Sequence, residues 1–323
     1  MKRFIVTGAT GLLGSALTIR LLDMGHQVVG VKRDSKPFSR LQLENRAQEV
    51  LFAAVDLTQP TQVRRMLFEY QPDCLVHLAA SPIVSTALAD PFSVWENNVR
   101  ASYTLLECVR AYGPLPLIVA STDKVYGDGA PPLAEEAPLL AKYPYDVSKL
   151  CVDRLAQCYA QTYGLPIAVI RPANIYGPGD FHYTRLIPGA IFSLLADRAP
   201  IIRSSGQPVR DFIFVDDVVE ALVRIVNRLQ DTDGTSCIYN IGSGRPHTVL
   251  DIVTRLIRVA GKQCAPIIQD RELKEINAQY LDITRMKQAL SFTPAIALTD
   301  GLERTYQWYH AIKQRHGSLP VIP

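Results

Sequence analysis

A tyrosine and a lysine stand four residues apart, at Tyr145 and Lys149, a spacing suited to proton chemistry. Pro144 predicts the start of a helix there, which would place both side chains on one face, one turn apart. A lysine ammonium beside a tyrosine hydroxyl stabilises the phenolate and lowers its pKa from about 10. Such a phenolate can accept a hydroxyl proton while a hydride leaves the same carbon. On its own, however, this spacing is more often an ordinary pair on an amphipathic helix.

Three polar residues follow the apolar run Leu117–Ala120 and add weight to the chemical interpretation. Thr122 would lie at the carboxyl end of a central strand, where its hydroxyl can bond the substrate oxygen that Tyr145 deprotonates. Asp123 and Lys124 come next, and a charged pair at this edge of a sheet is costly unless it is used or paired. Two explanations stay open, an acid and a base in catalysis or an ion pair that only shapes the pocket.

A glycine-rich loop lies between the apolar run Phe4–Val6 and a predicted helix. Its three glycines fit the spacing G-x-x-G-x-x-G, which allows a tight turn and lets the backbone approach a pyrophosphate. The helix that follows points free N–H groups and its positive dipole end at that anion. We therefore predict a dinucleotide site, contributed by the loop, by an acid after the third strand and by small residues after the fourth: Gly8, Thr10, Gly11, Leu12, Leu13, Gly14, Asp56, Leu57, Leu78, Ala79 and Ala80.

The residues after the run Val28–Val31 bear on which dinucleotide binds. NAD sites usually carry an acid here for the ribose 2′-hydroxyl, whereas NADP sites carry a cation for the 2′-phosphate. Lys32 and Arg33 occupy these positions, so the sequence favours NADP. NAD is the alternative, because Asp34 would reach the 2′-hydroxyl if the register were shifted.

Short apolar runs alternate with amphipathic stretches through the first half of the chain, and this rhythm predicts a doubly wound parallel sheet of Rossmann type. The chain after Arg171 looks irregular between Ile201 and Arg210 and then helical again. We expect residues 1–170 with about 211–245 to bind the dinucleotide, and about 171–210 with 246–323 to form a smaller substrate-binding lobe. The expected helices are Ser15–Met24, Gln62–Tyr70, Pro91–Tyr112, Val147–Tyr163, Arg185–Ala196, Asp216–Leu229, Val249–Val259, Thr284–Leu290 and Leu298–Ile312.

Composition excludes several other classes. The 323 residues carry a formal net charge of only +3, evenly spread, which argues against nucleic acid as a partner. No run approaches the roughly 20 apolar residues of a membrane helix, and no signal-peptide pattern precedes the first strand, so we expect a cytoplasmic protein. The six cysteines form no CxxC pair and stand near no histidine at ligand spacing, so we expect neither a metal nor a disulfide framework.

Several motifs occur in order over nearly the whole chain, from the glycine loop through His77–Ala80, Ser121–Gly127 and Arg171–Gly177 to Arg210–Val218 and Tyr239–Gly244. Together they resemble the extended short-chain dehydrogenase/reductases, in particular the nucleotide-sugar epimerases and dehydratases. The resemblance implies that Thr122, Tyr145 and Lys149 form a catalytic triad and that the substrate is a nucleoside-diphosphate sugar. It implies further cofactor contacts from Asn98 and Pro172, and substrate contacts from Ser81, Asn174, Arg185, Leu186, Arg210 and Arg271. It also implies a homodimer in which Pro91–Tyr112 and Val147–Tyr163 form a four-helix bundle.

The enzymes that this sequence resembles begin by oxidising the sugar at C4, and their later steps differ. A 4-epimerase returns the hydride after the keto sugar rotates, whereas a 4,6-dehydratase removes the C5 proton and expels the C6 hydroxyl, which needs an extra acid and an extra base. Asp123 and Lys124 resemble the pair of CDP-glucose 4,6-dehydratases, so we expect Asp123 as the acid and Lys124 as the base. As a base Lys124 would have to lose its proton, which burial and the charge of Lys149 would favour.

Alternatives to the dehydratase remain open. They are a 4-epimerase, an NADPH-dependent 4-keto-sugar reductase, and a non-enzymatic NADP-binding regulator, which would be expected to lack the intact triad. The nucleotide is also open, because Gly25–Phe38 resembles GDP-mannose 4,6-dehydratases whereas Gly177–Asp180 with Arg185–Pro188 resembles CDP-glucose 4,6-dehydratases.

Overall fold

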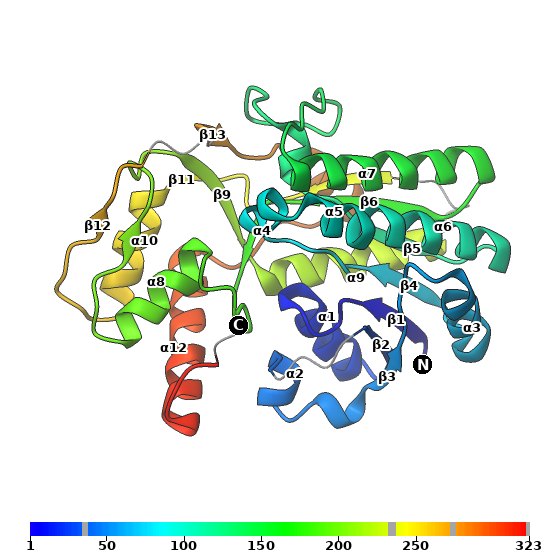
Figure 1. Cartoon of the computed structure of the whole chain (residues 1–323), viewed down its shortest axis with the longest axis horizontal. Helices are drawn as coiled ribbons and strands as arrows, with labels where there is room; N and C mark the ends of the chain where they lie inside the picture. Colours follow the sequence, from blue (N-terminus) through cyan, green and yellow to red (C-terminus); the bar gives the residue numbers. More distant parts are fainter. Residues whose placement is uncertain (34–37, 232–236, 272–275, 321–323) are drawn as a thin grey trace.

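A seven-stranded parallel sheet forms the centre of the computed structural model, which describes residues 1–33, 38–231, 237–271 and 276–320 (Figure 1). The strand order is β10-β6-β5-β4-β1-β2-β3, and every neighbouring pair runs parallel. The strands are β1 (Arg3–Thr7), β2 (Gln27–Lys32), β3 (Leu51–Ala54), β4 (Cys74–His77), β5 (Leu117–Ala120), β6 (Ile167–Pro172) and β10 (Cys237–Ile241). The predicted doubly wound sheet is therefore confirmed.

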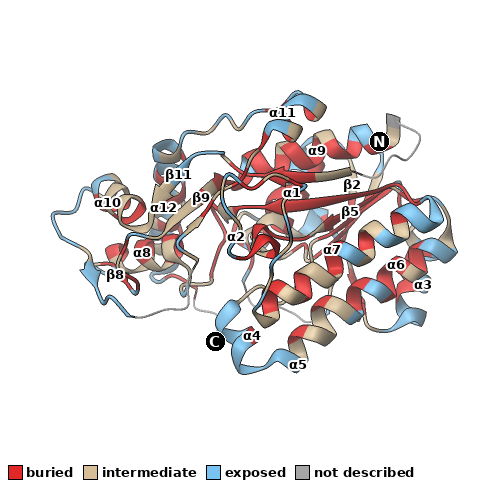
Figure 2. Ribbon diagram, turned by 90° about the horizontal axis from the view of Figure 1, so that it is seen from above, coloured by how far each residue is buried: buried red, intermediate tan, exposed pale blue. Residues whose placement is uncertain are grey.

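Helices cover both faces of this sheet because its strands are apolar on both sides. Phe4 and Val6 of β1 belong to one core, under α1 (Leu12–Asp23) and α9 (Val215–Asp231). Ile5 points into the opposite core, under α3 (Pro60–Tyr70), α6 (Ala101–Tyr112) and α7 (Pro144–Tyr163) (Figures 1 and 2). This alternation along one strand is what a parallel sheet buried on both faces requires.

The strand order reverses at β1, which pairs with β2 on one side and with β4 on the other. At such a switch point the loops after neighbouring strands run in opposite directions and leave a crevice at the carboxyl ends, where doubly wound folds bind ligands. The glycine loop follows β1, and the residues after β4 and β5 reach the same edge. The fold therefore brings the glycine loop and the predicted residues after β4 and β5 to one rim.

A second group of elements lies beside this rim, at the left of Figure 1. The chain leaves β6 and enters β7 (Asn174–Tyr176), which pairs with β9 (Val209–Phe214), and β9 also pairs with two short strands. These short strands are β11 (Pro246–Thr248) and β13 (Ala278–Gln279), and β8 (Ile201–Ile202) pairs separately with β12 (Ile267–Ile268). A third hydrophobic core joins α8 (Leu186–Leu195), α10 (Val249–Val259) and α12 (Leu298–His316).

Some sequence-based expectations differ from the structure in detail. The stretch Ile201–Arg210, expected to be irregular, contains β8 and the start of β9. The expected helix Pro91–Tyr112 is divided into α5 (Pro91–Val94), a π-helical turn over Trp95–Arg100, and α6. Further short helices occur at α2 (Arg40–Leu43) and α4 (Val84–Ala89), and α11 (Thr284–Leu290) packs against α9 and β10 rather than in the third core.

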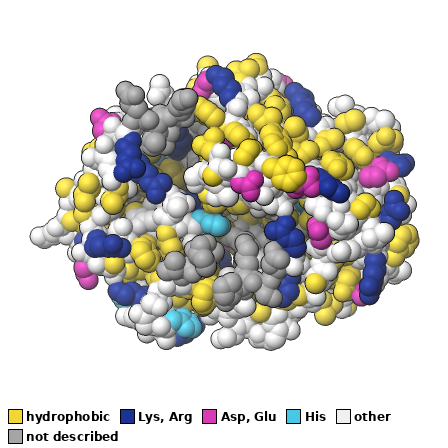
Figure 3. All heavy atoms as spheres, in the orientation of Figure 1, with side chains coloured by type: hydrophobic (Ala, Val, Ile, Leu, Met, Phe, Trp, Pro, Cys, Tyr) yellow, Lys and Arg dark blue, Asp and Glu magenta, His cyan; other side chains and the backbone are white. Residues whose placement is uncertain are grey.

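Acidic and basic side chains are interspersed on the face of the molecule shown in Figure 3. Among the described residues, every helix is too short or too polar to cross a bilayer. In the same part of the chain, no group of histidine, cysteine, aspartate and glutamate is arranged to hold a metal ion.

Candidate active site

The loop between β1 and α1 needs glycine at two positions for different reasons. Gly8 has a φ of +71°, and a Cβ there would lie 3.0 Å from the backbone of Leu78 and Ala79. A Cβ on Gly14 would lie 2.1 Å from the carbonyl oxygen of Gly8, so the helix can approach the loop only without a side chain. Gly11 donates to the same carbonyl oxygen at 3.0 Å and caps α1 without a side chain. The first turn of α1 therefore presents its N–H groups to an anion, and the cradle fits a pyrophosphate.

A chain of buried hydrogen bonds links this loop to the end of β4. The Thr7 hydroxyl accepts hydrogen bonds from the N–H groups of Leu78 and Ala79 at 3.1 Å and lies 2.8 Å from Nδ1 of His77. Nε2 of His77 lies 2.9 Å from the Ser102 hydroxyl. Burial, assisted by the charge of Lys149, lowers the pKa of His77 to about 3, so the ring is neutral.

The same network continues to the predicted catalytic helix. The Ser102 hydroxyl donates to the carbonyl oxygen of Asn98 at 2.5 Å. The Asn98 amide oxygen accepts from the Ser81 N–H at 2.7 Å, and its NH₂ donates to the Ser148 hydroxyl at 2.9 Å. Ser148 in turn donates to the carbonyl oxygen of Tyr145 at 2.6 Å. Asn98 therefore connects the first turn of α7 to the rim of the sheet. The sequence predicted only a cofactor contact for this residue.

The three predicted triad residues are all buried at this rim. Burial raises the pKa of Tyr145 to about 12 and outweighs the positive charge of Arg185 and the hydroxyl of Thr122, which act in the opposite direction. The expected lowering of the Tyr145 pKa by the protein's own groups is therefore wrong. Lys149 donates to the carbonyl oxygen of Ala120, and burial lowers the pKa of Lys149 itself to about 8.

Asp123 and Lys124 form an ion pair beside the triad. Nζ of Lys124 lies 3.1 Å from Oδ1 of Asp123 and 3.5 Å from the amide oxygen of Asn174. The Thr122 hydroxyl donates to the same Asp123 oxygen at 3.1 Å. Oδ2 of Asp123 is sealed from solvent and has no hydrogen-bond partner in the structure, although the residue is fully buried. One side of this carboxylate is thus satisfied by the protein and the other is not.

A second buried carboxyl group, which the sequence analysis missed, belongs to Asp146. It directly follows Tyr145 in the first turn of α7, is 5% exposed, and has its Oδ1 sealed without a hydrogen bond. Burial raises its pKa to about 6; the charge of Lys124 opposes this shift and that of Asp123 adds to it. The sequence offered only one signal, an acidic residue between Tyr145 and Lys149.

The two cations at the end of β2 both have partners. Nζ of Lys32 lies 4.5 Å from the centre of the Phe52 ring, and Arg33 donates to the side-chain oxygen of Asn97 at 2.7 Å. Asn97 donates in turn to the Ser81 hydroxyl at 3.1 Å. Asp34, the alternative ligand for the ribose, lies outside the described residues.

The other predicted cofactor residues occupy the ends of neighbouring strands. Oδ1 of Asp56 accepts two hydrogen bonds from Thr58 in the turn after β3, and Leu57 is buried. Thr10, Leu12 and Leu13 are partly exposed at the start of α1, as is Ala80 after β4, and Pro172 is the buried last residue of β6.

The predicted substrate residues are less closely grouped. Asn174 contacts Lys124 and donates to the carbonyl oxygen of Asp211 at 3.0 Å. Arg185, immediately before Leu186 at the start of α8, lies 2.9 Å from the buried Asp180 and acts electrostatically on Tyr145. Arg210 lies on β9 and donates to the carbonyl oxygen of Val209. Arg271 is exposed, and its N–H bonds the carbonyl oxygen of Arg203 beside the β8–β12 pair.

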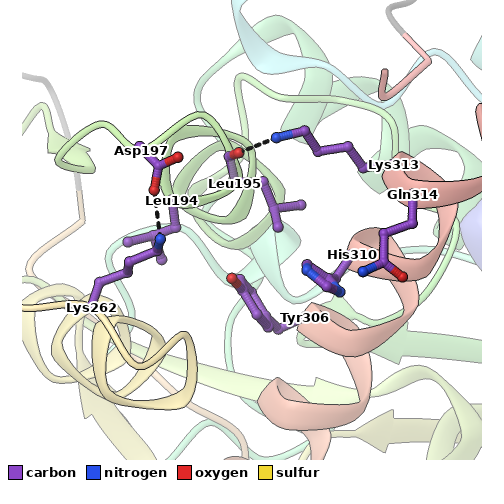
Figure 4. A pocket seen from close by; sticks show the side chains of 8 residues that line it. All are labelled: Leu194, Leu195, Asp197, Lys262, Tyr306, His310, Lys313 and Gln314. Atoms are coloured by element: carbon purple, nitrogen blue, oxygen red, sulfur yellow. Dashed lines mark hydrogen bonds and ion pairs between the residues drawn. The ribbon is translucent and has the colours of Figure 1, made fainter. Parts of the chain in front are cut away.

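A separate pocket of about 260 Å³ opens between α8, the end of α10 and α12 (Figure 4). Its two lysines are engaged, Lys262 with Asp197 at 2.5 Å and Lys313 with the carbonyl oxygen of Leu195 at 2.5 Å. None of the catalytic candidates lines it. The chemistry therefore belongs to the rim of the sheet and not to this pocket.

Comparisons with known proteins agree with this geometry. A sequence model of the NAD dependent epimerase/dehydratase family matches residues 4–242. The UDP-glucose 4-epimerase of Mycolicibacterium smegmatis is 31% identical over 312 residues, 95% of this chain and 98% of that protein. The dTDP-glucose 4,6-dehydratase of Haemophilus influenzae is 28% identical over 340 residues, 96% of this chain and 98% of that protein. A crystal structure of UDP-glucose-4-epimerase from Stenotrophomonas maltophila, with bound NAD and formylated UDP-arabinopyranose, matches with a TM-score of 0.88 at 26% identity, covering 98% of this chain and 100% of that one.

Proposed function

Because this chain belongs to the NAD dependent epimerase/dehydratase family, we propose that it is a nucleotide-sugar 4,6-dehydratase. The observation that carries the proposal is the ion pair of Asp123 and Lys124 at the triad, with one carboxylate oxygen left unbonded. An unsatisfied buried acceptor costs about 1–3 kcal/mol. A proton donor for a leaving hydroxyl group explains why the site keeps such a group, whereas epimerisation at C4 gives it no task.

The first step is oxidation at C4, and the triad residues supply its proton chemistry. Tyr145 accepts the O4 proton, and the Thr122 hydroxyl bonds the same oxygen. Lys149 supplies a positive charge at this end of the site. The dinucleotide, when bound in the cradle of Gly8, Gly11 and Gly14, supplies the hydride acceptor and a positively charged ring that favours the Tyr145 phenolate. The raised pKa of Tyr145 makes this charge important, because burial alone disfavours ionisation.

The second step expels the C6 hydroxyl as water, and we assign its protonation to Asp123. Its partner Lys124 donates to both Asp123 and Asn174, contacts that suit a proton source better than the base expected from the sequence. A proton passed from Nζ of Lys124 through Asp123 reaches the leaving oxygen. The pair therefore acts as one acid, and the geometry leaves the base to be found elsewhere.

For the cofactor we propose NAD rather than the NADP that the basic residues after β2 favour. Lys32 and Arg33 are directed to Phe52 and Asn97 within the protein. The solved epimerase relative carries NAD. Denaturing the purified protein and identifying the released dinucleotide by mass spectrometry checks this, and NADP would overturn it.

We propose a homodimer formed through the helices beside α7. Several large apolar side chains are exposed on these helices, including Leu88 of α4 at 58% and Phe92 of α5 at 72%, with Tyr103 on α6 and Tyr163 at the end of α7. Figure 3 shows apolar side chains gathered over α4, α5 and α7. Contiguous exposed apolar patches of this kind mark interaction surfaces. Light scattering at micromolar concentration should give twice the chain mass, and a monomer would refute the proposal.

The decisive test of function is incubation with UDP-, CDP-, GDP- and dTDP-glucose and GDP-mannose, followed by mass spectrometry. A dehydratase lowers the sugar mass by 18 units and leaves the dinucleotide unconsumed. A new isomer of unchanged mass would instead establish the 4-epimerase, which the similarity to the mycobacterial enzyme favours. Stoichiometric consumption of NADPH would indicate a keto-sugar reductase and would also refute the dehydratase.

A further inference from the structure

The second buried carboxyl group of the site, that of Asp146, has no task in the chemistry described so far. Its side chain is 5% exposed and Oδ1 is sealed from solvent without a hydrogen bond. An acid in the first turn of a helix is normally explained by the positive end of the helix dipole, which favours its charged form. Here burial acts more strongly, because the pKa of Asp146 is raised to about 6. Stabilisation of α7 therefore does not account for it.

The charged groups that act on Asp146 belong to the proposed acid. Lys124 and Asp123, on the turn after β5, are the two side chains whose charges influence it. On α7 itself Tyr145 precedes it and Lys149 follows one turn later. On the neighbouring π-helical turn Glu96 and Arg100 pair with each other at 2.9 Å, and on β6 Arg171 pairs with Asp153. α4, α5 and β5 carry no titratable side chain.

We propose that Asp146 is the base of the elimination, the group that removes the C5 proton of the sugar, in place of Lys124. This inference rests on the proposed dehydratase function. Two buried carboxylate oxygens lack partners in the structure, one on Asp123 and one on Asp146. Asp123 pairs with Lys124 at 3.1 Å, and the charges of both residues act on Asp146, which directly follows Tyr145 on α7. An acid and a base at one end of the site are what elimination across adjacent carbons requires.

Each step of the proposed cycle moves a proton or the hydride between named groups. Tyr145 takes the O4 proton as the C4 hydride leaves. Asp146 then takes the C5 proton, the C5–H electrons form the C5–C6 double bond, and the C6–O bond breaks as Asp123 and Lys124 protonate the oxygen to release water. The hydride returns to C6 and Asp146 returns its proton to C5.

One proton remains to be accounted for, and the structure provides its route. Tyr145 has gained a proton and the Asp123–Lys124 pair has lost one. The Thr122 hydroxyl interacts with Tyr145 and donates to Oδ1 of Asp123 at 3.1 Å. Transfer through Thr122 restores both groups, so the cycle ends with every residue in its starting state.

The test compares Asp146→Asn with Lys124→Met in the holoenzyme, using whichever nucleotide sugar of the panel the unmodified enzyme dehydrates. In D₂O the unmodified enzyme should incorporate deuterium at C5. Asp146→Asn should lower C5 exchange and water release at least 100-fold, the usual contribution of a general base, while reduced cofactor from C4 oxidation still forms. Lys124→Met should lose water release yet retain C5 exchange. In Lys124→Met the pH at which C5 exchange becomes faster should move upward, because the charge of Lys124, which lowers the Asp146 pKa, is then absent.

Exchange at the unmodified rate in Asp146→Asn, or loss of exchange confined to Lys124→Met, would overturn the inference. Cofactor content and melting temperature check that Asp146→Asn is folded. If it is not, Asp146→Glu provides the second test. If residue 146 is the base, deuterium exchange at C5 should persist in this variant and its rate should rise with pH near the pKa of about 6 given for Asp146. An exchange rate that is independent of pH between 5 and 8 overturns the inference. Failure of the function itself is separate, because then the unmodified enzyme removes no water from any sugar of the panel.

Discussion

Substitution of Gly14 by alanine should strongly weaken dinucleotide binding while leaving the fold in place. The added Cβ would lie 2.1 Å from the carbonyl oxygen of Gly8, and it must move to at least 3.0 Å. The first turn of α1 has to withdraw by that difference, which lengthens the hydrogen bonds that its N–H groups would make to a pyrophosphate. Hydrogen bonds to a charged group contribute about 1.5–3 kcal/mol each. Loss of two of them weakens binding by roughly 100-fold or more.

The assay is isothermal titration of the cofactor-free protein with NAD, together with the cofactor content of the purified protein. Gly11→Ala is the milder comparison, because its Cβ would lie 3.3 Å from the same oxygen, a tight contact that a shift of a few tenths of an ångström relieves. We expect less than a tenfold change for Gly11→Ala and a similar melting temperature for both variants without cofactor. Equal affinity of Gly14→Ala and the unmodified protein would refute the close approach of helix and loop as the basis of the site.

Three further predictions concern the buried groups around this site. Arg171→Met should destabilise the fold by about 3–5 kcal/mol, because it leaves the fully buried Asp153 without its charged partner. The double variant with Asp153→Asn should recover part of this loss in denaturant titrations. The pKa of His77 is depressed to about 3 in the folded protein. The stability contributed by the neutral ring is therefore fully present above pH 6.5 and is lost as the pH falls toward 3. The loss of stability amounts to about 5 kcal/mol, and the stability of His77→Gln should vary less over that range. Tyr145→Phe should abolish the transient reduction of the cofactor by substrate while retaining cofactor binding, which stopped-flow absorbance would show.

The strands in the first half of the chain were predictable because short apolar runs alternate there with helical patterns. β10 was missed, since its sequence, Cys237–Ile241, places Asn240 inside the strand. That asparagine is buried and its side chain bonds the backbone of Leu133 and Asp282 and the Tyr126 hydroxyl. Its polarity is thus satisfied by loops far away in the sequence, and periodicity within one segment carries no information about such partners.

The site residues also fall into those that the sequence pattern predicts and those that only the folded structure reveals. The glycine loop, Thr122, Tyr145 and Lys149 were found because their function depends on local spacing or on a strand end. Asp146 was overlooked because an acid in the first turn of a helix is common, and only its burial makes it unusual. The same holds for the Tyr145 pKa, which burial raises and which the charge of Arg185, at the start of α8, lowers only in part.

The network through His77 explains how two distant segments keep a fixed separation. Thr7 closes the end of β1 and Ser148 holds the first turn of α7, and the side chains between them pass one hydrogen bond to the next. Each donor in this chain has one acceptor, because a neutral His77 accepts at Nδ1 and donates at Nε2. A protonated ring would donate at both nitrogens and face the Thr7 hydroxyl as a second donor. The low pKa of His77 therefore preserves this hydrogen-bond network. The network in turn fixes the distance between the glycine loop, which would hold the hydride acceptor, and the Tyr145 hydroxyl, and both must approach the same carbon atom.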